Sequence, residues 1–411
     1  MKKIIFLIFL ASIIFGQETK ISNVDGSYVF VTDNKLSVKK LPTQLTANEL
    51  LGDVFLRGTD NNEIRFTEKI EIKKRSKNDA KELWEKVHTE LKSDDNGYKL
   101  SNDLKHKRYF GNGLRSIKYI LDVPKEISIA LSVVGGDFNI NNISGEIELV
   151  TTGGDVILKE LNGKIFTKTL GGDINSFALE GNIDLYSAGG DIECKNIIGN
   201  TKMKTMGGDI ILKVIKGRIE AKTFGGDIEI NEFDGKTIDL KTFGGDIKAI
   251  NIRGDLNTDT KGGDIEINDI KGNVEAETAG GNVEGIKIIG NAIVETAGGE
   301  IIINDISGSI ESKTMSGDIE ISKSYTNPKK DNSITLKSRN GSILLNIPQS
   351  MDGVINATAE GYGLDIVSDF DINISKINSR TIVAEGKINS GTHKIELYAE
   401  NGEIIIKKSS K

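Results

Sequence analysis

The sequence is poor in the side chains from which most catalytic and metal centres are built. Among 411 residues there is one cysteine, Cys194, and there are three histidines, His88, His106 and His393, which lie far apart. A single cysteine excludes an intramolecular disulfide bond and a cysteine-rich metal cluster. Widely separated histidines argue against a catalytic triad or a histidine–metal centre. We therefore expect no catalytic residue, no bound metal and no cofactor.

Charge of one sign and long apolar runs are scarce as well. The net charge is -7 and acidic and basic residues are interleaved, so we expect no binding to nucleic acid. The one long apolar run, Ile4–Phe15, is too short to span a membrane as a helix. It follows Lys2 and Lys3 and precedes the small residue Gly16, which is the pattern of a secretory signal peptide over residues 1–16. We expect an exported protein with no transmembrane segment beyond that peptide, located in the periplasm, on the cell surface or outside the cell.

Glycine, in contrast, is abundant, with 46 residues against 4 prolines, and much of it falls at a fixed spacing. A Gly-Gly-Asp triplet returns every 18 residues, with one interval of 19, and degenerate copies begin at Gly280, Gly298 and Ser316. A period this strict predicts stacked structural repeats. The triplets begin at Gly135, Gly153, Gly171, Gly189, Gly207, Gly225, Gly244 and Gly262.

Each repeat divides into two short strands. A further glycine follows nine residues after the second glycine of the triplet, as at Gly145 and Gly163, and apolar residues alternate with polar ones between the glycines. This alternation is typical of strands with one buried face, and glycine suits corners that need a positive φ. The sequence thus predicts an all-β fold: a single-stranded parallel β-helix, right-handed, with 18-residue coils and aliphatic columns inside.

The flanks differ from the repeats. Residues 17–122 are predicted to form a small N-terminal subdomain of strands with one helix over about 78–92, started by a cap at Ser76. Its apolar stripe, expected to pack on the N-terminal strands, is Ala80, Leu83, Trp84, Val87 and Leu91. Residues 123–324 are predicted to form the regular β-helix. Residues 325–411 are predicted to form irregular coils and a cap, because a solenoid must not end on a bare strand edge.

Two polar columns follow from the register. Thr or Ser lies two residues before each triplet, as at Thr205 and Thr223, and we expect these hydroxyls to point inward and to bond the main chain or one another. The triplet aspartates form the second column. We expect them to accept turn N–H groups rather than to form a ladder of weak Ca²⁺ sites, because one carboxylate per coil is a thin ligand set. They are Asp137, Asp155, Asp173, Asp191, Asp209, Asp227, Asp246 and Asp264.

A third column, the residue directly before each triplet, contains large apolar side chains. If the threonine column points inward, this column points outward at a corner, and an exposed apolar stripe would mark a contact surface. The simpler expectation is that the corner turns these side chains inward or that the N-terminal subdomain covers them, because exposed phenylalanine pairs are usually covered. The candidate contact residues are Leu170, Met206, Phe224, Phe243 and Met315. A neighbouring column changes sign along the repeats, and we expect lateral neighbours to balance its charges. It reads Lys204, Lys222, Lys241, Asp259, Glu277 and Glu295.

The segments around the repeats carry a family resemblance. GDVFLRGTDNNEIRF and a helix precede YILDVPKEISIALSVVGGDFNI, which leads into the repeats. SITLKSRNGSILLNIPQSMDGVINATAEGYGLDI and ELYAENGEIIIKK close the chain. Over roughly residues 48–408 this order resembles the bacterial "putative-adhesin" family of β-strand repeats, DUF4097. The resemblance implies a β-helical fold, an envelope or surface location and an adhesive role, and it brings no catalytic residues.

Taken together, the sequence favours an exported, non-enzymatic β-helix protein. It would act as an adhesin or as an envelope-associated binding or structural rod that contacts a surface glycan or an envelope protein. One alternative is a carbohydrate-active β-helix enzyme, a polysaccharide lyase or hydrolase, which would need a cleft with several convergent charged side chains. Another is an envelope scaffold that self-assembles through its coil ends.

Overall fold

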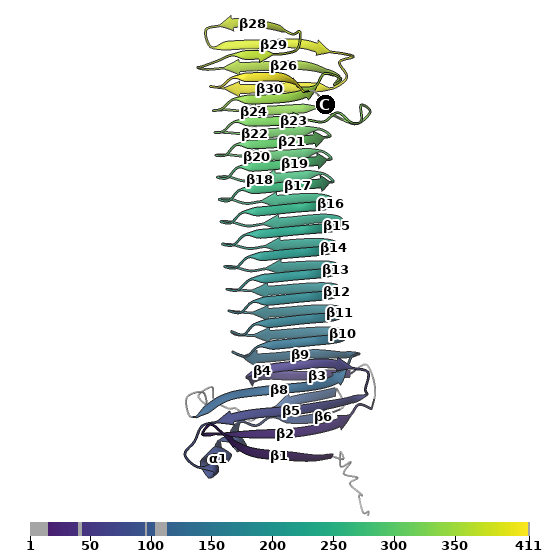
Figure 1. Ribbon diagram of the computed structural model, residues 1–411, viewed down its shortest axis with the longest axis vertical. Helices are drawn as coiled ribbons and strands as arrows, with labels where there is room; N and C mark the ends of the chain where they lie inside the picture. Colours follow the sequence, from purple (N-terminus) through teal and green to yellow (C-terminus); the bar gives the residue numbers. More distant parts are fainter. Residues whose placement is uncertain (1–14, 40–42, 95–96, 103–112, 410–411) are drawn as a thin grey trace, which may run out of the picture. The chain divides into compact units, whose positions relative to one another are not determined.

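The computed structural model describes residues 15–39, 43–94, 97–102 and 113–409. The predicted signal peptide, residues 1–16, lies almost wholly outside these residues. The chain divides into two compact units, Met1–Thr169 and Leu170–Lys411. In the described residues both units are built almost entirely of strands, with one helix in the first (Figure 1), so the predicted all-β class is confirmed.

The first unit changes from antiparallel to parallel pairing along its length. Strands β1 (Phe15–Val24), β2 (Ser27–Ser37), β5 (Glu63–Ile72) and β8 (Leu114–Pro124) pair antiparallel in that order. Parallel pairs then join β8 to β4 (Asp53–Thr59) and β4 to β10 (Phe138–Thr151). The remaining strands of this unit are β3 (Thr43–Leu51), β6 (Glu90–Asp94), β7 (Gly97–Ser101), β9 (Ile127–Val134) and β11 (Val156–Thr169).

The helix α1 (Lys77–Val87) begins as expected but ends earlier than the predicted 78–92. The Ser76 hydroxyl accepts a hydrogen bond from the Asp79 N–H at 3.1 Å, which caps the first turn. Trp84 is half-buried and stacks on Phe30 of β2, with ring centroids 5.6 Å apart. Leu91, expected on the helix stripe, instead lies in β6, which pairs with β7. That pairing satisfies the main chain after the helix, so the apolar periodicity alone overestimated its length.

A carboxyl group lies in the core of the first unit. Glu68 of β5 is fully buried, and its Oε1 accepts the Thr89 N–H at 2.8 Å. Its Oε2 has no hydrogen-bond partner among the described residues. Desolvation raises the pKa of Glu68 to about 8, against the opposing effect of the hydrogen bonds from Thr89. Beside it, the Thr89 hydroxyl donates to the buried Tyr119 hydroxyl at 3.2 Å.

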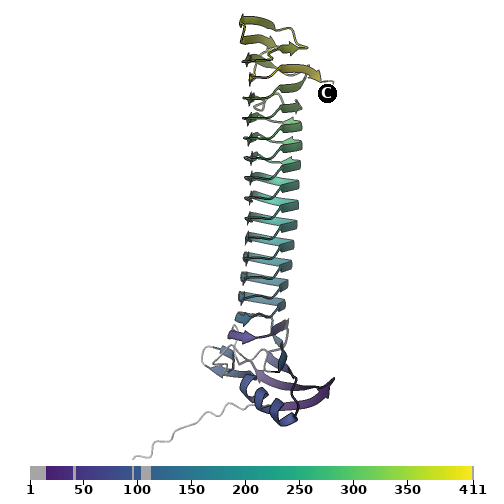
Figure 2. The same cartoon turned by 90° about the vertical axis from the view of Figure 1, so that its left-hand side faces the viewer.

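The second unit is a stack of parallel coils. In the first five coils one bent strand runs through most of each coil: β12 (Ile174–Ser187), β13 (Ile192–Lys204), β14 (Ile210–Lys222), β15 (Ile228–Lys241) and β16 (Ile247–Asp259). Their register follows the sequence period, for example Ile192 opposite Ile210 and Cys194 opposite Leu212. Figure 2 shows these coils edge-on, one above the next. The inward residues form the predicted aliphatic columns, which are fully buried, and the parallel β-helix is confirmed.

Later coils are split into two strands each. They are β17 (Ile265–Lys271) with β18 (Val274–Glu277), β19 (Val283–Ile289) with β20 (Ala292–Thr296), β21 (Ile301–Ser307) with β22 (Ile310–Thr314), and β23 (Ile319–Lys323) with β24 (Ile334–Ser338). β25 (Ile343–Pro348) follows. The closing segment contains β26 (Gly353–Glu360), β27 (Ile366–Ser368), β28 (Asn373–Asn378), β29 (Thr381–Ile388), β30 (Lys394–Glu400) and β31 (Ile404–Ser409). Here β26, β29 and β28 pair antiparallel, so the parallel stack ends in a hairpin layer.

Successive main chains approach closely at both corners of a coil, but the backbone conformation of the glycines differs. At the second corner Gly199 and Gly217 have φ of 132° and 123°, as expected, whereas Gly272 and Gly290 do not adopt positive φ. The triplet glycines from Gly189 to Gly299 do not adopt positive φ, so that part of the prediction is wrong for them. The left-handed residue at the second corner is a column that the sequence analysis did not single out. Its members have φ of 54° to 64° and are Asn142, Glu160, Ala178, Asn196, Val214, Glu232, Asn251, Asp269, Lys287 and Asp305.

Replacing Glu68 tests the buried carboxyl group. The folded-state pKa of about 8 lies above the ordinary value of 4.5, so the native state holds a proton that the unfolded chain has lost. This contribution to stability is present below the unfolded pKa and is lost as pH rises toward 8. The wild type should lose up to about 1.4 kcal/mol per pH unit between these values relative to Glu68→Gln.

Thermal unfolding across this pH range, followed by the fluorescence of the single tryptophan Trp84, measures the difference. Glu71→Gln, a partly exposed residue on the same strand, is the matched control. Equal pH dependence of the wild type and Glu68→Gln would contradict the assignment.

Candidate functional site

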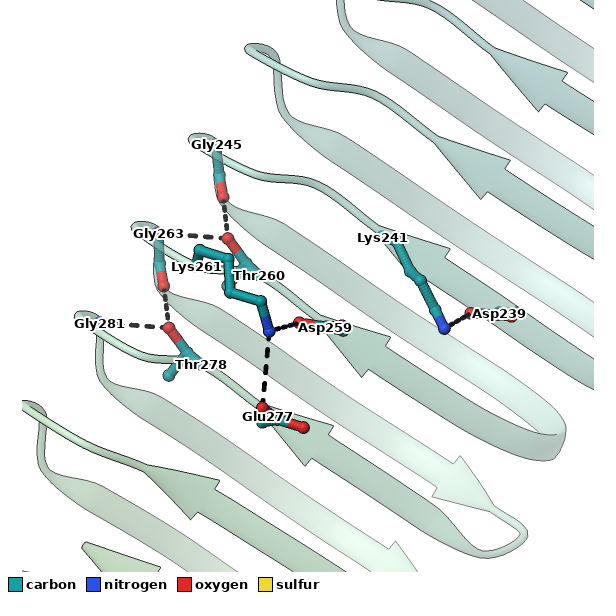
Figure 3. Close-up of polar contacts among 10 residues, drawn as sticks. All are labelled: Asp239, Lys241, Gly245, Asp259, Thr260, Lys261, Gly263, Glu277, Thr278 and Gly281. Carbon is teal, nitrogen blue, oxygen red and sulfur yellow. Dashed lines mark hydrogen bonds and ion pairs between the residues drawn. The ribbon is translucent and has the colours of Figure 1, made fainter. Parts of the chain in front are cut away.

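The triplet corner is held together by its threonine column. In the coil shown in Figure 3, the Thr260 hydroxyl donates to the Gly245 carbonyl at 2.8 Å and accepts the Gly263 N–H at 3.3 Å. Thr278 repeats both contacts one coil later, with Gly263 and Gly281. Each hydroxyl therefore joins two successive corners. The predicted structural role of the column is confirmed.

The second glycine of each triplet lies where no side chain fits. A Cβ on Gly226 would come within 2.2 Å of the Gly208 carbonyl oxygen, and one on Gly263 within 2.0 Å of the Gly245 oxygen. The first glycine is less constrained, since a Cβ on Gly225 would meet the Gly207 oxygen at 3.7 Å. Close approach of the main chains is therefore what the triplet requires.

The aspartate column accepts N–H groups from the next coil, as expected. Asp209 Oδ1 accepts the Asp227 N–H at 2.8 Å, and Asp227 Oδ1 accepts the Asp246 N–H at 2.7 Å. Where the triplet degenerates, Asn282 Oδ1 accepts the Glu300 N–H at 2.9 Å. Among the described residues no group of three or more His, Cys, Asp or Glu side chains could hold a metal ion. The cation ladder itself stays an untested alternative.

The residues before the triplets lie at the surface of the second unit, against the simpler expectation that they are covered. Phe224 and Phe243 are 62% and 56% exposed, and their rings stack with centroids 5.0 Å apart. Turning inward is impossible because the preceding threonine already fills the inward position. We call this column the corner stripe. It runs through Leu170, Ala188, Met206, Phe224, Phe243, Lys261, Ala279, Ala297, Met315 and Arg339.

The corner stripe contains a hollow that sequence reasoning missed. After Lys261 the side chains of the stripe shorten to Ala279 and Ala297, and a concavity of about 480 Å³ runs from there past Met315 to Arg339 and Tyr398. Its walls carry both signs of charge, among them Glu295 and other members of the neighbouring column. The only signal in the sequence was the change from phenylalanine to alanine along one column.

The neighbouring charged column is balanced by lateral pairs, as expected. Lys241 lies 3.4 Å from Asp239, and Lys261 lies 2.7 Å from Asp259 and 3.5 Å from Glu277 (Figure 3). Further along, Lys313 contacts Glu295 and Glu311, both at 2.8 Å, and these hydrogen bonds raise the pKa of Lys313. Such exposed pairs contribute little to stability.

One polar cluster in the closing segment brings together residues that are distant in sequence. The Tyr325 hydroxyl lies 3.2 Å from Asp352 Oδ2 and 3.4 Å from His393 Nε2. The buried Lys323 amine donates to the Gly308 carbonyl, and desolvation lowers its pKa to about 8. Lys323 and His393 are 4% and 8% exposed, so they are not presented to a polysaccharide chain.

The other singled-out side chain, Cys194, is fully buried. Its sulfur lies 3.6 Å from that of Met203, and desolvation raises the pKa of its thiol to about 12. A thiol that stays protonated is a poor nucleophile and a poor metal ligand. Cys194 therefore belongs to the packing of the coil.

These features agree with one family of proteins. The profile of the Toastrack DUF4097 family matches residues 51–267 and 235–407, which together cover most of the chain. The chain belongs to the Toastrack DUF4097 family. This confirms the resemblance noted in the sequence. No curated protein matches this chain. In the part of this Toastrack protein that the structure describes, no helix has the length and apolar character needed to span a membrane.

Several solved structures are similar to this Toastrack protein at low identity. A "putative cell adhesion protein" from Clostridium sporogenes is 10% identical and aligns over 96% of this chain and 99% of its own, with a TM-score of 0.16. A "putative adhesin" from Parabacteroides distasonis is 12% identical over 71% and 97%, with a TM-score of 0.25. One from Bacteroides fragilis is 16% identical over 70% and 95%, with a TM-score of 0.21. At such low sequence identities and TM-scores, the adhesion and adhesin descriptions apply to those proteins and are not transferred to this chain.

Substitutions at Asp227 separate the two interpretations of the aspartate column. Asp227→Asn keeps an oxygen for the Asp246 N–H, as Asn282 does for Glu300, and should change the free energy of unfolding by less than about 0.5 kcal/mol. Asp227→Ala leaves that N–H unpaired and should cost about 1 kcal/mol. Denaturant unfolding measures both. A calcium-dependent rise in the melting temperature of the wild type that Asp227→Asn removes would instead support cation binding.

Proposed function

We propose that this Toastrack protein is an exported, non-enzymatic binding protein of the cell envelope, of the adhesin type, and that the corner stripe is its contact surface. The observation that carries the proposal is the exposure of large apolar side chains in one column of the second unit, where Met206, Phe224 and Phe243 follow one another in successive coils. Leu170, Met206 and Met315 are at least half exposed, as are the two stacked phenylalanines. Contiguous exposed apolar surface marks sites of interaction.

The arrangement favours binding over catalysis. The hollow of the corner stripe is lined by acidic and basic side chains, but these are held in ion pairs, such as Lys313 with Glu295 and Arg339 with Glu400. The separate cluster at Lys323 and His393 is buried. A hydrolase or lyase needs convergent charged groups within reach of the substrate. The chemistry of the stripe instead suits recognition, in which apolar contacts exclude water around a few polar ones.

The repetition supplies the mechanism. Successive members of the corner stripe are one coil apart, about 4.8 Å by strand spacing, and each makes a similar weak contact. A partner that engages several coils at once gains affinity by multivalency without any single strong contact. The stacked rings of Phe224 and Phe243 suit the apolar face of a sugar or of a protein side chain. A surface glycan and an envelope protein are therefore the partner classes proposed.

Binding to envelope material tests the proposal. The mature chain and the variant Phe224→Ala/Phe243→Ala are immobilised and exposed to separated polysaccharide and protein fractions of the envelope. The variant should lose most of the bound material, because two central contacts are removed. Ile286→Ala/Ile289→Ala, which removes two exposed apolar side chains of the same unit away from the stripe, should bind like the wild type.

Undiminished binding by the Phe224→Ala/Phe243→Ala variant would contradict the proposed surface. Release of new reducing ends or unsaturated sugars from any polysaccharide fraction by the wild type would contradict the non-enzymatic assignment. Thermal unfolding of each variant confirms that it is folded before binding is compared.

A further inference from the structure

One section of the corner stripe, seven coils long, has large side chains next to its midpoint on one side and small ones on the other. From Met206 to Met315 the successive residues are Met, Phe, Phe, Lys, Ala, Ala and Met, with Lys261 in the middle. The rings of Phe224 and Phe243 form a ridge on one side of that lysine. A hollow of about 480 Å³ lies on the other side; it begins at the two alanines and continues past Met315 to Arg339 and Glu400. The ridge is two coils long, and ridge and hollow both begin one coil away from Lys261.

The neighbouring charged column changes sign at the same coil. Lys222 and Lys241 lie beside the phenylalanine ridge, Asp259 lies beside Lys261, and Glu277 and Glu295 lie beside the alanine hollow. The coil register fixes these positions, since Lys241 pairs with Asp259, Asp259 with Glu277 and Glu277 with Glu295 in the parallel ladder. The change of sign between Lys241 and Asp259 therefore lies within one coil of Lys261, where the ridge gives way to the hollow.

We propose that the corner stripe pairs two copies of this chain, antiparallel, about a two-fold axis that crosses the stripe at Lys261. This deepens the proposed function, on which it rests, by naming the partner of the same surface. The axis places Phe224 of one copy against Ala297 of the other, and Phe243 against Ala279. Met206 meets Met315. An isologous contact of this kind uses one patch twice and closes at two copies.

The same axis brings two pairs of opposite charges together. A two-fold axis lying across the stripe keeps the charged column opposite its own counterpart, so that Lys222 faces Glu295 and Lys241 faces Glu277. Lys204 faces Lys313, and on the axis Lys261 and Asp259 each face their own counterpart. These like charges are met within each chain, since Lys313 contacts Glu295 and Glu311 and Lys261 contacts Asp259. Complementary charges fix register and orientation more than they add affinity.

A parallel pairing does not fit these side chains. It would set the phenylalanine ridge against the other ridge and leave the two alanine hollows facing each other across an unfilled gap. A gap between apolar surfaces forfeits the contacts that favour association. The volume of the hollow lies in the range that protein pockets offer to bound groups, which is sufficient for the ring side chains of the ridge.

Self-association of the full mature chain tests this pairing. Sedimentation equilibrium, in EDTA so that cations cannot bridge the aspartate columns, should show a monomer–dimer equilibrium for the wild type. Phe224→Ala/Phe243→Ala removes the ridge, and Ala279→Phe/Ala297→Phe fills the hollow. Each should raise the dissociation constant about tenfold or more. Phenylalanine already occupies this position in two coils, so the filled variant is compatible with the fold.

A mixture of the two variants decides the geometry. The chain without ridges has hollows on both sides of Lys261, and the filled chain has ridges on both sides, so the mixture should form heterodimers with nearly the wild-type affinity. The matched control Ile286→Ala/Ile289→Ala should dimerise like the wild type.

A wild type that stays monomeric at its highest soluble concentration would overturn the inference, and so would a mixture that fails to associate. If the stripe variants then still lose envelope binding, the proposed function stands and only the self-pairing fails. If envelope binding is also unchanged, both fail.

Discussion

The structure depends on how closely the main chains of successive coils approach at the triplet corner. A Cβ atom on the second glycine of a triplet would clash with the carbonyl oxygen of the preceding coil. In the regular coils from Gly190 to Gly263 the two atoms would be only 2.0 to 2.3 Å apart. This approach lets each threonine hydroxyl reach one carbonyl and one N–H of two successive corners. It also brings each aspartate within reach of the next coil's N–H. Glycine, threonine and aspartate therefore form one hydrogen-bonded corner structure, which is repeated along the chain.

The same corner structure explains which side chains are exposed on the surface. Because the threonine side chain is committed to the inside of the corner, the residue after it must point out, whatever its chemistry. Phenylalanine there remains exposed in two coils, and alanine in two others leaves a hollow. Each coil therefore has, directly before its triplet, an outward position whose side chain takes no part in the hydrogen bonds of the corner. The proposed recognition uses this position.

Much of the fold could be predicted from the sequence because the period is strict and the apolar alternation is regular. The threonine and aspartate contacts also followed from parity and from the hydrogen-bonding capacity of their side chains. Parity with the inward threonine column indicated an outward direction for Phe224 and Phe243. Their exposure could not be predicted, since such residues are usually covered and only the corner geometry decides it. The left-handed column was missed for a related reason: its members, such as Val214 and Asn251, share a backbone conformation but no chemistry. Leu91 continued the helical pattern, yet strand pairing of β6 with β7 determined its structure.

A matched pair of glycine substitutions tests the central claim most directly. Gly226→Ala places a methyl group 2.2 Å from the Gly208 oxygen, whereas Gly225→Ala, one residue earlier, meets nothing closer than 3.7 Å. Denaturant unfolding of the full chain should show a loss of about 3 kcal/mol or more for Gly226→Ala. For Gly225→Ala the change should stay within about 1 kcal/mol. Equal losses at the two positions, or a Gly226→Ala protein as stable as the wild type, would contradict the account.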